Sequence, residues 1–343
     1  MNSNASPMRF VGQESMSQSD SMSNPMSNPI LNPMLNRMST PAPLRPGDAI
    51  AILSPATEIK SEYIDGAIAE LKRRGYEPIE MPFTRGHEYG TFAATDRERL
   101  ADLKSAIENP RVKAILCGRG GYGCVHLLSR EWQESVRRNP KWIIGFSDIS
   151  ALHALWQKAG VQSVHSSMAK QLTLHPLDSL TDGIFRLMEK PEEEVRYTTP
   201  AIEGSIEGEA EGELVGGNLA VLNGLAATPW DILSPDYLRG KVLFLEDVGE
   251  KIYQVERMLK RLQLAGSLDA AAGIVFGRFT DYNADRNYPS MEAMISERLK
   301  EWGIKCPVVL GFPIGHIDDN FPVTEGRRVR LIIKDAEAKL TLL

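Results

Sequence analysis

Residues 141–160 read KWIIGFSDISALHALWQKAG, a strand pattern that runs straight into a helical one. The run KWIIGF is typical of a buried strand, and ISALHALWQKAG has apolar residues at helical spacing. Gly145, Phe146, Ser147 and Asp148 form the junction. A strand followed this directly by a helix is a unit of a doubly wound α/β protein, in which ligands bind where the strands end.

The same alternation of strand and helix patterns precedes this stretch. Repeated strand, helix and strand units imply parallel pairing of the strands. The segments are DAIAILSPA (48–56), SEYIDGAIAELKRRGY (61–76), EPIEMP (77–82), TDRERLADLKSAIENP (95–110) and VKAILCGRGGYG (112–123). We therefore predict an α/β fold whose N-terminal domain covers residues 44–172.

The alternation of strand and helix patterns ends at about Gln171. A polar, Pro-containing stretch with little strand character predicts a linker over residues 173–205. Beyond it, a Gly-rich β segment, further apolar strands and a terminal hairpin pattern predict a β-rich second domain over residues 206–343. Its clearest strands are KVLFLEDVG (241–249), AAGIVFGRF (271–279) and PVVLGFPIGH (307–316).

Length and composition bound the class of protein. A chain of 343 residues has room for two domains, and 42% hydrophobic with 24% charged residues is a globular composition. The net charge of -6 argues against a nucleic-acid partner, and the longest apolar run is too short for a membrane span. An odd number of cysteines and the lack of a signal-peptide pattern predict a cytoplasmic protein.

Residues 1–43 have a composition of their own. Ser, Asn, Pro and Met dominate, and an imperfect repeat, MSNP-MSNP-ILNP-MLNR, runs over residues 22–37. Such a segment buries too little apolar surface to offset its ordering entropy, which predicts a disordered, low-complexity tail. A translation start at Met38 is the alternative.

Ser147 is the first candidate for chemistry. At a sharp junction of strand and helix its hydroxyl projects from the sheet edge, and the helix N-terminus offers amide donors to an anion. The motif is similar to the nucleophile elbow G-x-S-x-G, although Ile149 stands at the second Gly position. The structural alternative is a Ser that caps the helix.

The turn Gly118-Arg119-Gly120-Gly121-Tyr122-Gly123 matches the dinucleotide-binding pattern G-x-G-x-x-G. It follows the third predicted strand rather than the first, and no acidic residue ends a strand about 20 residues later, so this interpretation is disfavoured. Its backbone amides can instead stabilise an oxyanion beside Ser147. A plain tight turn is the remaining alternative.

His316 lies in the Gly/Pro loop GFPIGH after an apolar strand, which singles it out among the histidines. Glu246 ends the strand FLEDVGE, with Asp247 beside it; it is either a solvent-facing strand end or the acid that orients the His. The order Ser, Glu, His along the chain suits a serine hydrolase. The other histidines are His87, His126, His153, His165 and His175.

The sequence predicts no metal site and no cofactor. Neither H-E-x-x-H nor C-x-x-C occurs, and no Walker A motif is present. Cys117, Cys124 and His126 would make at most an irregular cluster, and buried structural cysteines are the favoured interpretation.

Taken together, these motifs resemble the LD-carboxypeptidase family of serine peptidases, which includes murein tetrapeptide carboxypeptidases and microcin C immunity peptidases. The resemblance covers nearly the whole body of the chain. It is carried by RPGDAIAILSPA, CGRGGYGCVHLL, WIIGFSDISALH, GGNLAVL, LFLEDVGEKIYQVERML and GFPIGH, in that order.

The resemblance implies a flavodoxin-like N-terminal domain that carries Ser147 and a β-rich C-terminal domain that carries Glu246 and His316. Ser147 would be the nucleophile, His316 the general base and Glu246 the residue that orients it, with the amides of Asp148 and Gly121 as oxyanion hole. It further implies a homodimer that removes the terminal D-alanine of murein tetrapeptides during cell-wall recycling, without metal or organic cofactor.

A carboxypeptidase must also bind a free carboxylate. Arg119 in the glycine turn is our candidate, because a guanidinium can pair with a carboxylate through two hydrogen bonds. A solvent-facing position or a salt bridge between the domains is the alternative.

The chain departs from the family pattern at a few positions. Ser166 and Ser167 follow His165 where Gly and Pro are expected, Glu256 stands where Asp is more usual, and the N-terminal tail is extra. Two other functions remain open. One is hydrolysis of peptidyl-nucleotide antibiotics, for which Trp230 and Trp156 are nominal aromatic platforms, and the other is a non-catalytic nucleotide-binding protein that uses the GRGGYG turn.

Overall fold

A parallel sheet occupies the N-terminal part of the chain in the computed structural model, which describes residues 38–86, 90–176 and 178–343. The strands lie in the order β11 (Val323–Glu325), β5 (Ser163–His165), β4 (Trp142–Gly145), β3 (Val112–Cys117), β1 (Ala49–Leu53) and β2 (Glu77–Glu80). The pairs from β2 to β5 are parallel, and their order 2-1-3-4-5 is that of flavodoxin-like sheets.

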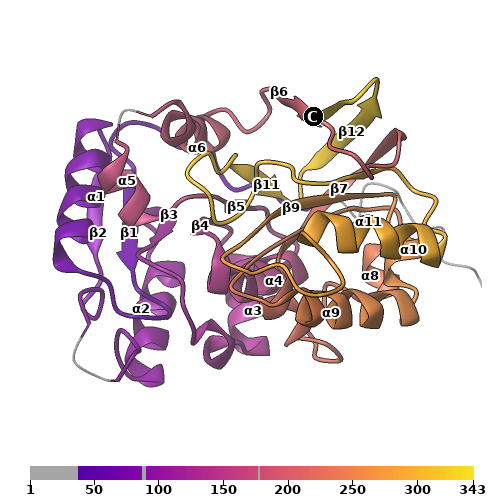
Figure 1. Cartoon of the computed structure of the whole chain (residues 1–343). Coiled ribbons are helices and arrows are strands. Elements are labelled where there is room, and N and C mark those ends of the chain that lie inside the picture. The colour runs from indigo at the N-terminus through magenta and orange to yellow at the C-terminus, as the bar shows by residue number, and fades with distance from the viewer. Residues whose placement is uncertain (1–37, 87–89, 177) are drawn as a thin grey trace, which may run out of the picture. The chain divides into compact units, whose positions relative to one another are not determined.

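Strand β11 comes from the C-terminal part of the chain and pairs antiparallel with β5. Figure 1 shows it in yellow beside the magenta β5. This contribution to the first sheet is absent from the sequence-based prediction.

A mixed sheet follows in the C-terminal part. Its strands lie in the order β10 (Val308–Val309), β9 (Gly273–Thr280), β8 (Val242–Val248), β7 (Gly208–Asn218), β12 (Arg328–Lys334), β13 (Glu337–Leu342) and β6 (Val195–Pro200). The pairs from β10 to β7 are parallel, and the remaining pairs are antiparallel. The predicted α/β fold, with a flavodoxin-like sheet and a second β-rich part, is therefore confirmed.

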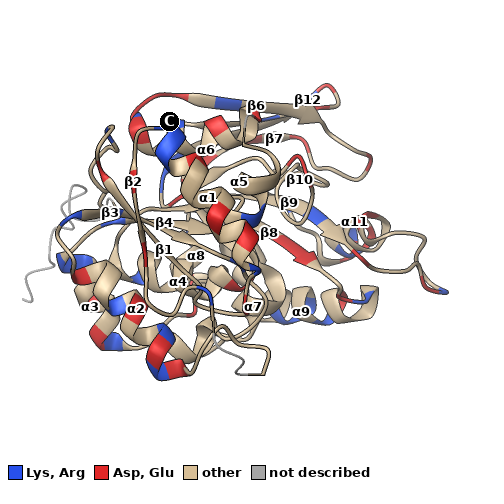
Figure 2. Ribbon diagram, turned by 90° about the vertical axis from the view of Figure 1, so that its left-hand side faces the viewer, with Lys and Arg blue, Asp and Glu red and all other residues tan. Residues whose placement is uncertain are grey.

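Helices connect and cover the strands. They are α1 (Ser61–Arg73), α2 (Asp96–Glu108), α3 (Arg130–Arg138), α4 (Ser150–Ala159), α5 (Ala169–Leu174), α6 (Ser179–Glu189), α7 (Leu219–Asn223), α8 (Pro235–Leu238), α9 (Ile252–Leu264), α10 (Ser267–Ala270) and α11 (Met291–Trp302), with 3-10 turns η2 (Cys124–Leu127) and η3 (Ser147–Ile149). Charges of both signs are interspersed on α2 and α3 (Figure 2). Among the described residues, no helix combines the length and the apolar character that a membrane span requires.

Local sequence explains where two of these helices begin and end. Thr95 and Glu98 form a capping box at the start of α2, in which Glu98 Oε2 accepts from the Thr95 N–H at 3.0 Å. Helix α4 ends at Gly160, whose φ of 76° is the left-handed conformation that glycine adopts without strain.

The core runs from one sheet into the other. Val164 of β5 and Phe244 of β8 belong to the same buried cluster, and Phe146 belongs with Leu245 to the second cluster. Residues 38–343 form one compact unit. The side chains at the ends of β4 and β8 therefore lie on a continuous apolar support.

Two predicted segments differ from the structure. The stretch 173–205, expected to have little strand character, contains α6 and the edge strand β6, which pairs with β13. The predicted tail extends to residue 43, but Ser39 bridges to Val161 and Met38 is buried, so residues 38–43 belong to the body. Residues 1–37 lie outside the described residues, and the domain boundaries themselves remain a prediction.

Candidate active site

Ser147 occupies the turn between β4 and α4 in a strained conformation. Its φ of 64° is left-handed, an unfavourable state for a residue with a Cβ. Phe146 is the N-cap residue of η3 and Ile149 that of α4, so Ser147 caps neither helix and the capping alternative is wrong. The strain turns the chain sharply and leaves Ser147 half-buried at the carboxyl end of β4.

The glycine turn packs directly against Ser147. A Cβ at Gly120 would lie 2.9 Å from the Ser147 Cβ and 3.3 Å from the Asp148 backbone nitrogen. Gly121 has a φ of 116°, and a Cβ there would lie 2.0 Å from Thr57 Oγ1. Only glycines allow this approach, which brings the two predicted oxyanion-hole amides, those of Asp148 and Gly121, into one neighbourhood.

Asp148 links the Ser147 turn to the end of the glycine turn. Its buried carboxylate accepts a hydrogen bond of 2.8 Å from the backbone N–H of Cys124, the first residue after the glycine turn. Burial raises the pKa of Asp148, partly opposed by this hydrogen bond. The side chain of Asp148 therefore holds the turn, and its backbone amide stays beside Ser147.

His316 and Glu246 form a close pair at the end of the second sheet. The Nδ1 of His316 lies 2.7 Å from Glu246 Oε2; because a carboxylate only accepts, the imidazole donates from Nδ1. The Glu246 side chain is fully buried and that of His316 is 18% exposed. Burial opposes protonation of His316, but the hydrogen bond and charge of Glu246 outweigh it and raise the pKa of the imidazole.

Glycines allow the loop of His316 to approach the acid. Gly315 has a φ of 131°, and a Cβ there would lie 2.9 Å from Glu246 Oε2. A Cβ at Gly277 of β9 would lie 3.2 Å from the Glu246 Cβ. The sequence interpretation of Glu246 as a solvent-facing strand end is wrong, because the carboxylate lies beneath this loop.

Phe146 joins the two halves of the site. Its ring centroid lies 4.8 Å from that of His316, so the residue next to Ser147 contacts the imidazole. The structure thus brings the residue before Ser147 into contact with the His316–Glu246 pair of the second sheet, and the triad of Ser147, Glu246 and His316 stays a prediction.

Asn218 and Asp247 were missed as site residues. Asp247 accepts from Asn218 Nδ2 at 3.0 Å and from the Ala220 N–H at 2.8 Å, and Asn218 N–H donates to Ser150 Oγ at 2.9 Å. Burial, with the neighbouring charge of Glu246, raises the pKa of Asp247 to about 7. These bonds tie β7 and β8 to the start of α4; only the Glu-Asp pair at a strand end hinted at them.

Arg119 is exposed in the glycine turn, and its guanidinium donates to the Glu58 carbonyl at 3.3 Å. This position agrees with the solvent-facing alternative and leaves most of its donors open to a ligand carboxylate.

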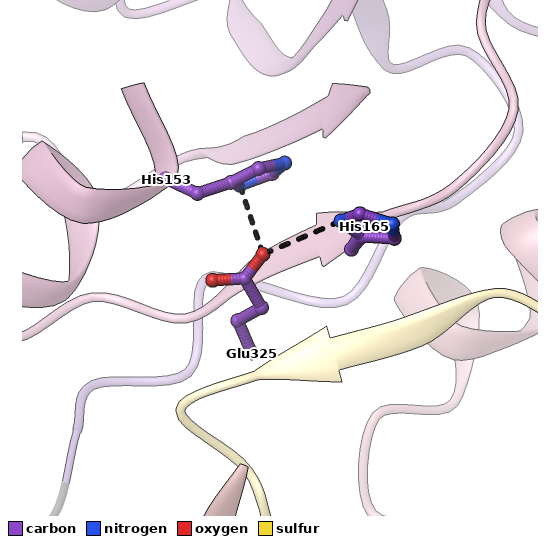
Figure 3. A group of neighbouring side chains, drawn as sticks. All are labelled: His153, His165 and Glu325. Atoms are coloured by element: carbon purple, nitrogen blue, oxygen red, sulfur yellow. Dashed lines mark ion pairs between the residues drawn. The ribbon is translucent and has the colours of Figure 1, made fainter. Parts of the chain in front are cut away.

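Cys117 and Cys124 are buried structural cysteines, as the sequence interpretation favoured, and do not form a metal-ligand group with His126. Both cysteines are buried and free, and His126 instead lies 3.1 Å from Asp96. Within the part of the chain that the structure describes, a different group has metal-ligand composition: His153, His165 and Glu325, all fully buried (Figure 3). No motif pointed to Glu325, which lies in the stretch FPVTEGRRVR (321–330).

Comparisons with known proteins agree with this architecture. The family models for the LD-carboxypeptidase N-terminal and C-terminal domains match residues 50–166 and 211–331. The probable murein peptide carboxypeptidase of Bacillus subtilis is 33% identical over 298 residues, covering 85% of this chain and 91% of the relative.

The crystal structure of muramoyltetrapeptide carboxypeptidase from Oxalobacter formigenes superimposes with a TM-score of 0.76 at 31% identity, over 86% of this chain and 98% of that one. The microcin C7 self-immunity protein of Escherichia coli is 26% identical over 309 residues, covering 80% of this chain and 88% of the relative. The chain therefore belongs to the LD-carboxypeptidase family of peptidases, and the predicted resemblance is confirmed.

Proposed function

We propose that this protein is a serine carboxypeptidase that hydrolyses the LD-peptide bond to the terminal D-alanine of murein tetrapeptides. The observation that carries the proposal is the His316–Glu246 hydrogen bond beside the strained Ser147 turn. The names of the Bacillus and Oxalobacter proteins, both above 30% identity, support a murein peptide as the substrate class.

His316 is the general base of the proposed mechanism. Because Nδ1 donates its proton to Glu246, the neutral imidazole has its lone pair on Nε2. Nε2 takes the Ser147 hydroxyl proton as Oγ attacks the carbonyl carbon of the scissile bond. The buried Glu246 carboxylate stabilises the imidazolium that forms.

The glycine turn supplies the oxyanion hole in this proposal. The N–H groups of Asp148 and Gly121 donate to the carbonyl oxygen as it becomes negative. The tetrahedral intermediate collapses, the C–N bond breaks, and His316 gives the proton to the amine of D-alanine. Water, activated by the same imidazole, then hydrolyses the acyl-enzyme and restores the Ser147 hydroxyl.

Arg119 is the proposed partner of the substrate's free carboxylate. Its exposed guanidinium lies in the same turn as Gly121, and an arginine can pair with a carboxylate through two parallel hydrogen bonds. The proposed location is the cytoplasm, because three free cysteines fit a reducing compartment. The proposed assembly is a homodimer.

The test is D-alanine release from purified murein tetrapeptide, followed by mass spectrometry without added metal. We expect release by the wild type and a loss on the order of 10⁴-fold or more in Ser147→Ala. Ser135→Ala, which removes a buried hydroxyl from α3, is the matched control and should keep full activity.

Equal release by the wild type and Ser147→Ala would remove Ser147 from its role. If neither releases D-alanine, the murein substrate is wrong and a peptidyl-nucleotide is the next substrate. That alternative has support in the microcin C7 self-immunity relative. Dinucleotide binding that Ser147→Ala leaves intact, with no hydrolysis, would favour the nucleotide-binding interpretation.

A further inference from the structure

Strand β11 links the loop of His316 to the sheet that carries Ser147. In its register with β5, Val323 lies opposite His165 and Glu325 opposite Ser163. On the other side of β5, His165 lies opposite Gly145 of β4. Gly145, His165 and Val323 therefore form one row across β4, β5 and β11. This row connects the residue before the Phe146–Ser147 turn with the strand that follows the His316 loop.

The loop before β11 is closed by its own hydrogen bonds. The Gly315 N–H donates to Asn320 Oδ1 at 2.9 Å, and the Phe321 N–H donates to the Pro313 carbonyl at 2.8 Å. The Asn320 side chain that makes the first bond is buried. Because these bonds span His316, a shift of β11 moves the imidazole with it.

Glu325 anchors β11 from within the core. Its Oε2 accepts a short hydrogen bond from Gln157 Nε2 of α4, and its Oε1 faces the two imidazoles, 3.9 Å from His153 Nδ1 and 3.8 Å from His165 Nδ1 (Figure 3). The Nε2 of His153 in turn donates a hydrogen bond of 2.9 Å to the Gly145 carbonyl. We call His153, Gln157, His165 and Glu325 the Glu325 clasp.

The hydrogen-bond pattern of the clasp does not suit a metal ion. A carbonyl only accepts, so Nε2 of His153 carries the proton and Nδ1 has the lone pair, which lies 2.8 Å from the Ser163 hydroxyl and accepts from it. Donors bound at about 2.0–2.2 Å to one zinc ion lie about 3.4 Å apart, closer than Glu325 Oε1 lies to either imidazole. Both ring nitrogens of His153 are therefore taken up by hydrogen bonds within the protein, whereas the ring nitrogens of His165 and Glu325 Oε1 are buried without a hydrogen-bond partner among the described residues.

Burial disfavours the charged form of each ionisable group in the clasp. Burial raises the pKa of Glu325 well above its usual range, although the bond from Gln157 opposes the shift. Burial also lowers the pKa of His153 to about 4 and that of His165 well below its usual value. A glutamine has the same shape as Glu325, carries no charge and can accept the same hydrogen bond from Gln157.

We propose that Glu325 is a positioning residue that, through Gln157 and β11, sets the place of His316 relative to Ser147. The proposal rests on the proposed function only in the roles of Ser147 and His316. It does not depend on the substrate.

The test measures the rate at which a fluorophosphonate probe labels Ser147, together with kcat and KM for D-alanine release. In Glu325→Leu we expect labelling and kcat to fall on the order of 10- to 100-fold, because misplacing a catalytic group by about 1 Å costs this much. The KM should change less than about twofold, since no binding residue is altered. Glu325→Gln should restore most of the rate.

Glu70→Leu is the matched control, because it removes another buried carboxylate, on α1, which is ion-paired with Arg73 and Arg74. It should lower the melting temperature but not the labelling rate. If Glu325→Leu fails to fold, Gln157→Leu removes the same hydrogen bond from the other side.

Wild-type labelling rates in Glu325→Leu or Gln157→Leu, or no rescue by Glu325→Gln, would refute the positioning role. If the probe labels the wild type but the wild type releases no D-alanine, the murein substrate is wrong. The labelling rates of the variants then still decide whether Glu325 positions His316. A wild type that the probe does not label would overturn the serine mechanism and the positioning role together.

Discussion

The two sheets contribute to the candidate site in different ways. The parallel sheet offers Ser147 through backbone geometry, with a left-handed residue and glycines that allow a second turn to lie against it. The mixed sheet offers His316 and Glu246 through buried electrostatics, in a pair that lies far apart in the chain. The Ser147 half of the site depends on shape, and the His316–Glu246 half depends on charge. Substitutions that change the shape without the charge, or the charge without the shape, therefore separate the two contributions.

The largest effect should come from the charged half. Glu246→Gln keeps the shape but removes the carboxylate that fixes the His316 tautomer, and we expect kcat for D-alanine release to fall on the order of 10³- to 10⁴-fold. Because Glu246 raises the pKa of His316 and the neutral imidazole is the base, activity falls as the pH drops through that pKa. Without the charge, the acidic limb of the pH profile should move to lower pH.

The pH profile of fluorophosphonate labelling measures this shift directly. An acidic limb that stays in place in Glu246→Gln would mean that the pair does not tune the base, and that the two halves differ less than described.

The shape-dependent half should respond to a single methyl group. Gly120→Ala places a Cβ 2.9 Å from that of Ser147, so the turn must move away. We expect the labelling rate to fall about 10- to 100-fold, with no shift of the acidic limb. Ser135→Ala on α3, which removes a buried hydroxyl, is the control.

The same pH profile decides the outcome for Gly120→Ala. A displaced acidic limb would show that the glycine turn also affects the charge of His316, against the separation of the two halves.

The smallest effect concerns the hydrogen bond between the halves. Ser150→Ala removes the acceptor of the Asn218 N–H, and a lost buried hydrogen bond of this kind costs about 1 to 2 kcal/mol of unfolding free energy. Urea denaturation measures it, with Ser135→Ala as reference. Activity should fall only a few-fold; a loss as large as in Gly120→Ala would make Asn218 part of the oxyanion geometry.

Local sequence patterns predicted much of this architecture. They did not predict which segments pair when these lie far apart in the chain. The strand, turn and helix around Ser147 lie within twenty consecutive residues, so periodicity and the Gly-Phe-Ser-Asp junction sufficed. His316 was singled out because it lies in a Gly/Pro loop after an apolar strand, and Glu246 because it is an acid that follows four apolar residues. Their pairing and the oxyanion amides came from the family resemblance.

Pairing between distant segments escaped the sequence analysis. Glu325 lies in the short strand β11, whose partner β5 is distant in the chain, and three residues carry no usable period. Strand β6 alternates half-buried with exposed residues and ends in Pro200, so its pattern is that of a polar linker unless the pairing with β13 is known. In both cases the partner, and not the segment, determines the structure.

The position of β11 also has a consequence for how the protein is made. On the ribosome, β5 is synthesised roughly 160 residues before the strand that covers its edge, and at about 5–20 residues per second its backbone stays open for roughly ten to thirty seconds. An exposed strand edge is a template for pairing with other chains. We expect nascent chains released before Glu325 to aggregate, and synthesis speed to influence the yield of the full-length protein.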